Sequence, residues 1–183
     1  MEFEIIRTTR RTMAAEIKQN KLIVRAPLWA SDTDVDRFLL QNKNRIERHL
    51  AKARQREEAK AGIRKLTPDE LEALAARARE MIPQRVAHYA PLVGVTYGRV
   101  TIRKQRSRWG SCSSKGNLNF NCLLMLTPPG VIDSVVVHEL CHRKQMNHSK
   151  EFYAEVLRVF PDYWEQHKWL KDNGALIMAM RDI

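Results

Sequence analysis

Apolar and polar residues alternate in short runs from residue 3 to residue 26, the pattern of strands that bury one face. We expect a small antiparallel sheet there, with a turn at Asn20–Lys21 and an end near Pro27. Ser31 or Asp32 can then cap a helix, because either side-chain oxygen can accept from the first free backbone N–H groups. The apolar stripe predicted for this helix consists of Phe38, Leu39, Ile46 and Leu50.

A second helix has a clear start signal. Thr67 can cap it, Pro68 fits the first helical position, and Glu70 completes a capping box. Apolar residues at helical spacing continue to about Pro91. Pro83 should strain or kink the middle of this helix, because proline lacks an N–H and crowds the preceding turn.

Two strands and three helices are predicted after this point. Residues 97–104 and 117–124 alternate apolar and polar side chains, so each predicts a strand with one buried face. The segment 107–113 between them is expected to be a loop. Helices are predicted at residues 131–145, from a cap at Ser149 onward, and at residues 162–173, with Gly174 as the stop.

The charge pattern divides the chain. Residues 51–60 carry charges on nearly every side, which predicts an exposed extension or a linker. We therefore expect a β-rich segment with a charged helix at residues 1–60 and a separate domain at residues 61–183. The expected fold class is α+β, with a helical core whose helix 131–145 packs on a small antiparallel sheet.

The basic residues are unevenly distributed. The chain has 32 Lys and Arg against 21 Asp and Glu, a net charge of +11, yet no acidic residue falls between Met81 and Ile132. A concentrated positive field attracts phosphates, nucleic acids or acidic peptides, although a solvated basic face explains the total charge equally well. The cations of this acid-free stretch are Arg85, Arg99, Arg103, Lys104, Arg106, Arg108 and Lys115.

Other features indicate a cytoplasmic protein. No apolar run approaches the length of a membrane span, and the N-terminus has no secretory pattern. The three cysteines, Cys112, Cys122 and Cys141, are odd in number and lack CxxC spacing. A disulfide framework is therefore not expected.

The chemistry is concentrated in the pentapeptide His138-Glu139-Leu140-Cys141-His142. Side chains four residues apart on a helix project from one side, so both imidazoles can bind one ion. Glu139 can then accept the proton of a water that zinc has made more acidic. His148 can reach the same ion if the helix ends near Gln145 and the chain turns back. Three protein ligands with one open position describe a catalytic zinc site, so we expect residues 61–183 to form a zincin-like, metal-binding catalytic domain.

The motif spacing equals that of metzincins, but Gln145 replaces their glycine and no methionine-turn sequence follows. The chain more closely resembles the YgjP-like metallopeptidase family, which is related to the WLM and SprT-like proteins. The matching segments are Arg108–Cys112, Asn119–Asn121, the HELCH pentapeptide, and Asn147–Ser149 with Phe152. The resemblance implies that His138, His142 and His148 bind zinc and that Glu139 is catalytic. It does not supply a substrate.

Three functions are consistent with the sequence. A zinc-dependent metallopeptidase is the leading hypothesis, with manganese, nickel or cobalt as alternative metals. A nucleoside triphosphate pyrophosphatase using the same site is the second, because a zinc ion flanked by arginines suits polyphosphates. The third is a protease associated with nucleic acid, although no zinc-finger spacing or helix-turn-helix pattern is evident. No membrane partner is expected.

Several further residues are candidates for binding substrate or stabilising an oxyanion. Arg108 lies beside Trp109 near the end of a predicted strand, where it could hold an oxyanion or a phosphate. Tyr153 is a weaker candidate, because its spacing also fits simple burial. Arg103 could bind phosphate, and Asn119 lies on a polar strand face that would suit an edge along an extended substrate or plain solvation.

Overall fold

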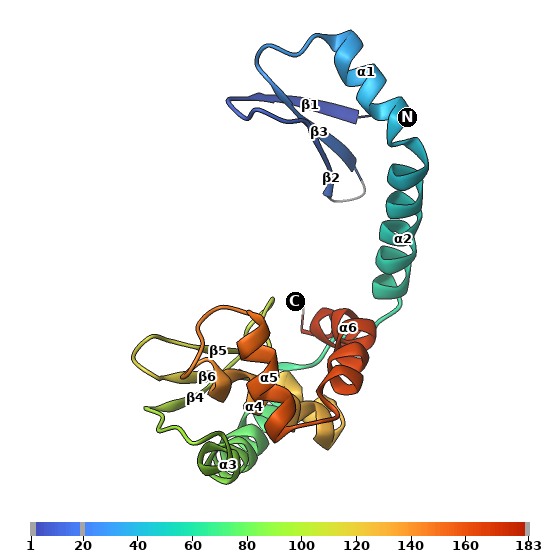
Figure 1. Cartoon of the computed structure of the whole chain (residues 1–183). Helices are drawn as coiled ribbons and strands as arrows, with labels where there is room; N and C mark the ends of the chain where they lie inside the picture. Colours follow the sequence, from blue (N-terminus) through green and yellow to red (C-terminus); the bar gives the residue numbers. More distant parts are fainter. Residues whose placement is uncertain (1–2, 19–20, 182–183) are drawn as a thin grey trace. The chain divides into compact units, whose positions relative to one another are not determined.

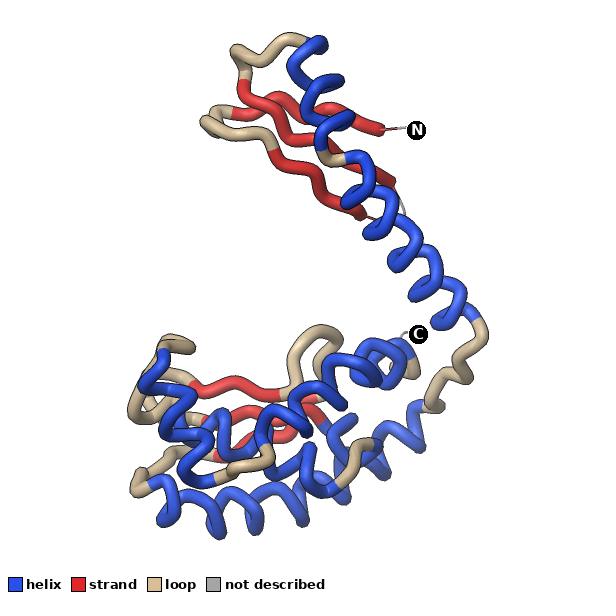
Figure 2. Tube along the Cα trace, turned by 45° about the vertical axis from the view of Figure 1, so that its right-hand side comes forward, coloured by secondary structure: helices blue, strands red, loops and turns tan. Residues whose placement is uncertain are grey.

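The computed structural model describes residues 3–18 and 21–181 (Figure 1). The chain forms two compact units, Met1–Gly62 and Ile63–Ile183. Each unit contains its own three-stranded sheet with helices, and the trace in Figure 2 shows both sheets. Among the described helices, none combines the length and the apolar character that crossing a membrane requires.

The sheet of the first unit has the strand order β1 (Phe3–Thr8), β3 (Lys21–Pro27), β2 (Ala14–Lys18). β3 is antiparallel to β2 but parallel to β1, so the prediction of a wholly antiparallel sheet was wrong. The third strand inserts between the first two, and two successive reversals of the chain leave it parallel to the first. The predicted end at Pro27 is confirmed. Of the predicted turn, Lys21 begins β3 and Asn20 lies outside the described residues.

Two helices follow, α1 (Asp32–Gln41) and α2 (Lys43–Ala61). Ser31, the first of the two predicted caps, is the N-cap of α1. Its Oγ accepts from the backbone N–H of Asp34 at 3.2 Å, and the Asp34 carboxylate accepts from the Ser31 N–H at 3.0 Å. The predicted apolar stripe is shared between the two helices, with Ile46 buried and Phe38, Leu39 and Leu50 partly buried.

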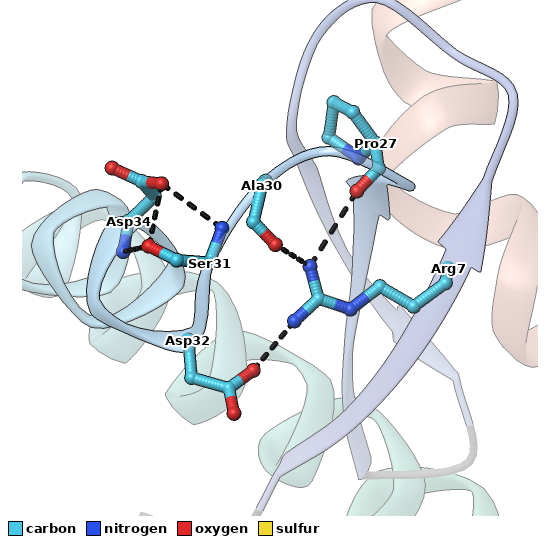
Figure 3. A network of polar contacts seen from close by, with 6 residues as sticks. All are labelled: Arg7, Pro27, Ala30, Ser31, Asp32 and Asp34. Atoms are coloured by element: carbon cyan, nitrogen blue, oxygen red, sulfur yellow. Dashed lines mark hydrogen bonds and ion pairs between the residues drawn. The ribbon is translucent and has the colours of Figure 1, made fainter.

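Arg7 fixes the turn that leads from the sheet into α1 (Figure 3). Its guanidinium donates to the backbone carbonyls of Pro27 and Ala30 and forms an ion pair with Asp32. Carbonyls at a strand end would otherwise need water, so one side chain satisfies several acceptors here. The buried core of this unit consists of Leu22, Val24, Ala26, Ala30, Val35 and Ile46.

The second unit begins with the long helix α3 (Pro68–Val93). The predicted capping box is confirmed: Thr67 Oγ1 accepts from the Glu70 N–H at 3.2 Å, and the Glu70 carboxylate accepts from the Thr67 N–H at 2.8 Å. The helix continues through Pro83 and ends at Gly94, whose φ of 76° is a left-handed conformation that favours glycine.

A second small sheet has the order β4 (Val100–Arg103), β6 (Leu118–Asn121), β5 (Gly110–Cys112). β6 is parallel to β4 and antiparallel to β5, so the antiparallel prediction was wrong here too. The predicted loop 107–113 contains β5, which the short pattern GSC did not reveal. β6 is the central strand, so the interpretation of the asparagine-rich strand as an edge, one of the two that its polar face left open, was wrong.

The 3₁₀ helix η1 (Cys122–Leu126) connects β6 to α4 (Pro129–Cys141). α4 ends before its predicted limit at Gln145, because the chain tightens into 3₁₀-type bonds: the N–H of Arg143 donates to the Leu140 carbonyl. The next helix, α5 (Lys150–Val159), is capped by Ser149 as predicted.

The last helix, α6 (Tyr163–Ala179), does not end at Gly174 as predicted. A Cβ atom on Gly174 would lie 3.1 Å from Cζ2 of Trp109. The glycine therefore makes room for an indole ring instead of ending the helix. One core joins α3, β6, η1, α4, α5 and α6, and its largest fully buried side chains include Ile82, Leu118, Phe120, Leu123, Leu140 and Phe152.

Candidate metal centre

Helix α4 is buried along nearly its whole length and presents two histidines on one side. His138 and His142 are four residues apart, and their ring centroids lie 4.9 Å apart. His142 is the C-cap residue and still has a helical φ of −62°, so its side chain continues the face that His138 begins. Both histidines therefore keep their positions on this face, although the helix ends earlier than predicted.

His148 meets this pair from the segment that leads into α5. The ligand atoms of the three histidines lie within 4.8 Å of one another, and Nε2 of His138 is 3.0 Å from Nε2 of His148. Ligand nitrogens around a tetrahedral zinc ion are separated by about 3.3 Å, given Zn–N bonds of about 2.0–2.1 Å. Three converging imidazoles are therefore a donor set that fits a divalent cation.

The ring of Phe152 packs against all three imidazoles. Its ring centroid lies 4.9 Å from His138, 4.7 Å from His142 and 4.9 Å from His148, and its side chain is fully buried. The cap at Ser149 fixes the start of α5 and so fixes where this ring sits. An apolar floor limits the movement of the imidazoles and keeps water away from one side of them.

Two ring nitrogens have partners outside the triad. Nδ1 of His138 is 2.9 Å from the hydroxyl of Tyr163, which is only 3% exposed, and Nδ1 of His142 is 3.0 Å from the carbonyl of Gln145. When Nδ1 donates to an oxygen, the lone pair of Nε2 is free to face an ion. The Gln145 carbonyl can only accept, so it selects this tautomer in His142, and the Tyr163 hydroxyl can accept from Nδ1 of His138 in the same way.

Glu155, which lies on α5 near the triad, is bonded to cations and not to an imidazole. The carboxylate of Glu155 accepts from Arg158 at 2.6 Å and from Nζ of Lys144 at 2.6 Å, and these bonds lower its pKa to about 2. The Lys144 pair ties α5 to the turn between His142 and His148. Glu165 is exposed on α6.

Burial sets the protonation of the cluster. Loss of solvation, followed by the neighbouring histidines, lowers the pKa of His138 to about 3, and loss of solvation also lowers the pKa of His142. Both imidazoles are consequently neutral at physiological pH, which is the form that binds metal.

Glu139 lies beside the triad with a side chain that is 5% exposed. Loss of solvation raises the pKa of this carboxyl group to about 8, and a nearby divalent cation would favour the charged form instead. The backbone of β5 approaches it closely: a Cβ on Gly110 would lie 2.6 Å from Oε1 of Glu139. Only glycine leaves the carboxyl group this space.

A cavity of about 480 Å³ opens beside His138, Glu139 and His148. Three of the sequence candidates, Arg108, Trp109 and Tyr153, are among its lining residues. Among the lining residues that sequence reasoning missed, three come from α6: Tyr163, His167 and Leu170. Their spacing of four and seven residues places them on one helix face, which is the signal that could have found them.

The structure does not bring Arg103 and Asn119 to this cavity. They lie on the neighbouring strands β4 and β6, with Arg103 Nε 3.4 Å from Asn119 Oδ1. Two other cations of the acid-free stretch already have partners: Arg85 pairs with Asp133 and Lys104 with Glu72. The positive field at the site is therefore weaker than the sequence pattern predicted.

The family model for the YgjP-like metallopeptidase domain matches residues 65–173, a range that includes the three histidines and Glu139. The chain belongs to the YgjP-like metallopeptidase family. The YgjP-like domain thus accounts for most of the second unit and for none of the first. Membership implies a metal cofactor and a peptide or protein substrate.

Two solved structures resemble the YgjP-like chain at low identity. The metallopeptidase zymogen of Pyrococcus abyssi abylysin is 23% identical with a TM-score of 0.46, covering 50% of this chain and 94% of that one. The metallopeptidase zymogen of Methanocaldococcus jannaschii jannalysin is 18% identical with a TM-score of 0.45, covering 50% and 95%. No curated protein matched the chain.

Proposed function

We propose that the protein is a zinc-dependent peptide hydrolase with His138, His142 and His148 as the metal ligands. The convergence of their ring nitrogens within 4.8 Å, with Glu139 beside them at the cavity, is the observation that carries the proposal. Three histidines leave a fourth coordination position open, as catalysis requires. Imidazole donors also accept cobalt, nickel or manganese, so zinc is the first metal to load.

When bound, zinc would polarise the scissile carbonyl and make a water molecule more acidic. The chain's own contribution begins with Glu139, which holds that water, accepts its proton as it attacks, and passes the proton to the leaving amine. Burial of the carboxyl group raises its pKa and so makes Glu139 a stronger base for the first of these two transfers. Gly110 leaves the space that this movement needs.

Arg108 and Tyr153 are our candidates for binding the oxyanion or a substrate carbonyl. Both line the cavity, Arg108 with an exposed side chain and Tyr153 half-buried, with its ring 6.1 Å from that of His148. Trp109 gives the cavity an apolar wall that can hold a substrate side chain. A donor fixed near the developing charge contributes about 10²–10³ in kcat.

The test is unbiased profiling of the zinc-loaded protein against a peptide mixture, with the variant Glu139→Gln beside it. We expect the variant to retain one zinc per chain and to lose nearly all cleavage. If Glu139→Gln cleaves at the wild-type rate, the assignment of the base is wrong. If no peptide is cleaved by protein that holds zinc, the proposed activity is wrong.

A second candidate is hydrolysis of nucleoside triphosphates at the same site. Glu139 is the only acidic residue among the described lining residues, and Arg108 lies at the cavity, so polyphosphate would meet little repulsion. Nucleotides screened beside the peptides test this, with Arg108→Ala expected to reduce release of pyrophosphate or phosphate. Nothing in the described residues favours the nucleic-acid-associated alternative over these two.

We also propose that residues 1–60 and 61–183 are separate domains and that the second has a zincin-like fold. Each unit has its own buried core and its own sheet, which supports independent folding. Limited proteolysis tests the boundary: first cleavage between Gly62 and Thr67 would support it, and first cleavage inside α3 would contradict it.

A further inference from the structure

A second cavity, of about 610 Å³, lies entirely within the first unit. Residues of β2 line it on one side and residues of α2 on the other, and these two elements contact each other. Its volume is in the range of binding pockets, which is roughly 300–1,000 Å³. No residue of the metal centre belongs to it.

The helix wall of this cavity is basic. Arg45, His49 and Lys52 follow one another at spacings of four and three residues, so they share one face of α2, and all three are exposed. In the described part of the chain, neither Arg45 nor Lys52 forms a side-chain ion pair. These two cations are therefore available to a ligand.

The acidic residue of the lining does not cancel this charge. Glu16 accepts from Nε of Arg25 at 3.0 Å and from its terminal nitrogen at 2.8 Å. That pair is neutral by itself. The remaining charge around the cavity is positive.

The β2 side of the cavity offers free backbone hydrogen-bonding groups and apolar side chains. β2 is an edge strand: of the described strands, only β3 pairs with it, so its outer backbone groups are open. Ala15 and Ile17 are partly buried against the core and also line the cavity, together with the buried Leu22 and Ile46. An extended peptide can satisfy such an edge with its own backbone, whereas a nucleic acid cannot.

We propose that this groove binds an extended acidic peptide segment as an added strand beside β2, with its carboxylates facing α2. Alternate residues of a strand point to the same face, about 7 Å apart. Arg45 and Lys52 are separated by about 10 Å along the helix axis, which two long acidic side chains can reach. The residues between these carboxylates lie on the other face of the added strand, away from α2, where β-branched residues favour the extended conformation. Binding here does not depend on the metal centre.

The experiment uses the full chain and a short, acetylated and amidated fluorescent peptide in which glutamate alternates with valine. We expect saturable binding that weakens as salt rises, because the contacts include exposed charges. The variant Arg45→Ala/Lys52→Ala should raise the Kd about 10-fold. The matched variant Arg48→Ala/Arg54→Ala removes the same charge from α2 at positions outside the cavity lining and should change the Kd less than about twofold.

Edge pairing has a separate signature. Only every second N–H of an added strand faces its neighbour, so methylating one set of alternate backbone nitrogens should abolish binding while methylating the other set should not. Equal effects of the two methylated peptides would overturn the strand-addition geometry. Equal effects of the two double variants would overturn the site.

Two further outcomes would overturn the proposal. One is the absence of peptide binding to the wild-type chain. The other is tighter binding of single-stranded oligothymidylate with the same dependence on Arg45 and Lys52, which would assign the groove to nucleic acid. If the peptide binds and oligothymidylate does not displace it, the result supports a protein segment as the occupant.

Discussion

The contact between Tyr163 and His138 gives the sharpest test of the metal centre. Replacing Tyr163 by Phe removes one hydroxyl and keeps the ring that packs near His138, at a centroid distance of 6.0 Å. The lost hydrogen bond is 2.9 Å long, and the tyrosine is 3% exposed, so water cannot easily replace the hydroxyl. Nδ1 of His138 is then left without its partner, and the imidazole is free to rotate or to change tautomer.

The expected magnitude follows from that burial. Leaving a buried polar group unpaired costs about 1–3 kcal/mol, and loss of a partner to a metal-binding histidine weakens metal affinity about 10- to 100-fold. We expect Tyr163→Phe to weaken zinc binding within this range, measured by competition with a chromophoric chelator. Far-UV circular dichroism of both proteins without metal checks that the fold is retained.

Tyr153→Phe is the matched control. It removes the same atom from the same cavity, but in the described residues the Tyr153 hydroxyl has no hydrogen-bond partner. Its zinc affinity should stay within about threefold of the wild type. Equal zinc affinity of Tyr163→Phe and the wild type would refute the reasoning. Equal weakening by both variants would show that the effect is not specific to His138.

Three further predictions concern the same unit. Gly110→Ala forces a Cβ to within 2.6 Å of Oε1 of Glu139, so we expect kcat to fall about 10²-fold while the zinc content is unchanged. Gly130→Ala is the control and should stay active, because its Cβ meets only the amide end of a side chain. Glu155→Gln should lower the free energy of unfolding by about 1 kcal/mol above pH 4.5, since the folded pKa is lowered. That difference should disappear as denaturation is measured toward pH 2, and a constant difference would contradict the ion-pair explanation. Removing the metal with a chelator should abolish cleavage and lower the Tm, and both should return with zinc.

Local sequence signals were sufficient for the elements that begin with a cap. The boxes at Ser31 and Thr67 and the cap at Ser149 are formed by residues within three positions of each other, so no distant contact is needed to predict them. The HExxH pattern belongs to the same class, because helical spacing alone places His138 beside His142. The meeting of His148 with this pair was predicted, and the structure brings the ring nitrogens together. Binding of zinc by them stays a prediction.

Features that depend on contacts between distant segments were decided only by the tertiary structure. The order of both sheets follows from which strand inserts between two others, and alternation along one strand carries no information about that choice. Gly174 illustrates the same limit: a glycine near a helix end resembles a stop signal, yet its role is to admit the indole of Trp109 from a distant loop. The partner of His138 likewise comes from α6, and its spacing in sequence from the motif predicts nothing about contact.

The charges around the site also depend partly on the sequence and partly on the tertiary structure. The sequence alone determined that residues 81–132 contain no acidic side chain. Only the fold decided that Asp133 and Glu72 neutralise two of the cations there and that Arg103 is directed to Asn119 instead of the metal centre. The physical reason is that helix caps and ligand spacing act over a few residues of one chain segment. Ion pairs and cavity linings depend on packing between segments far apart in the sequence.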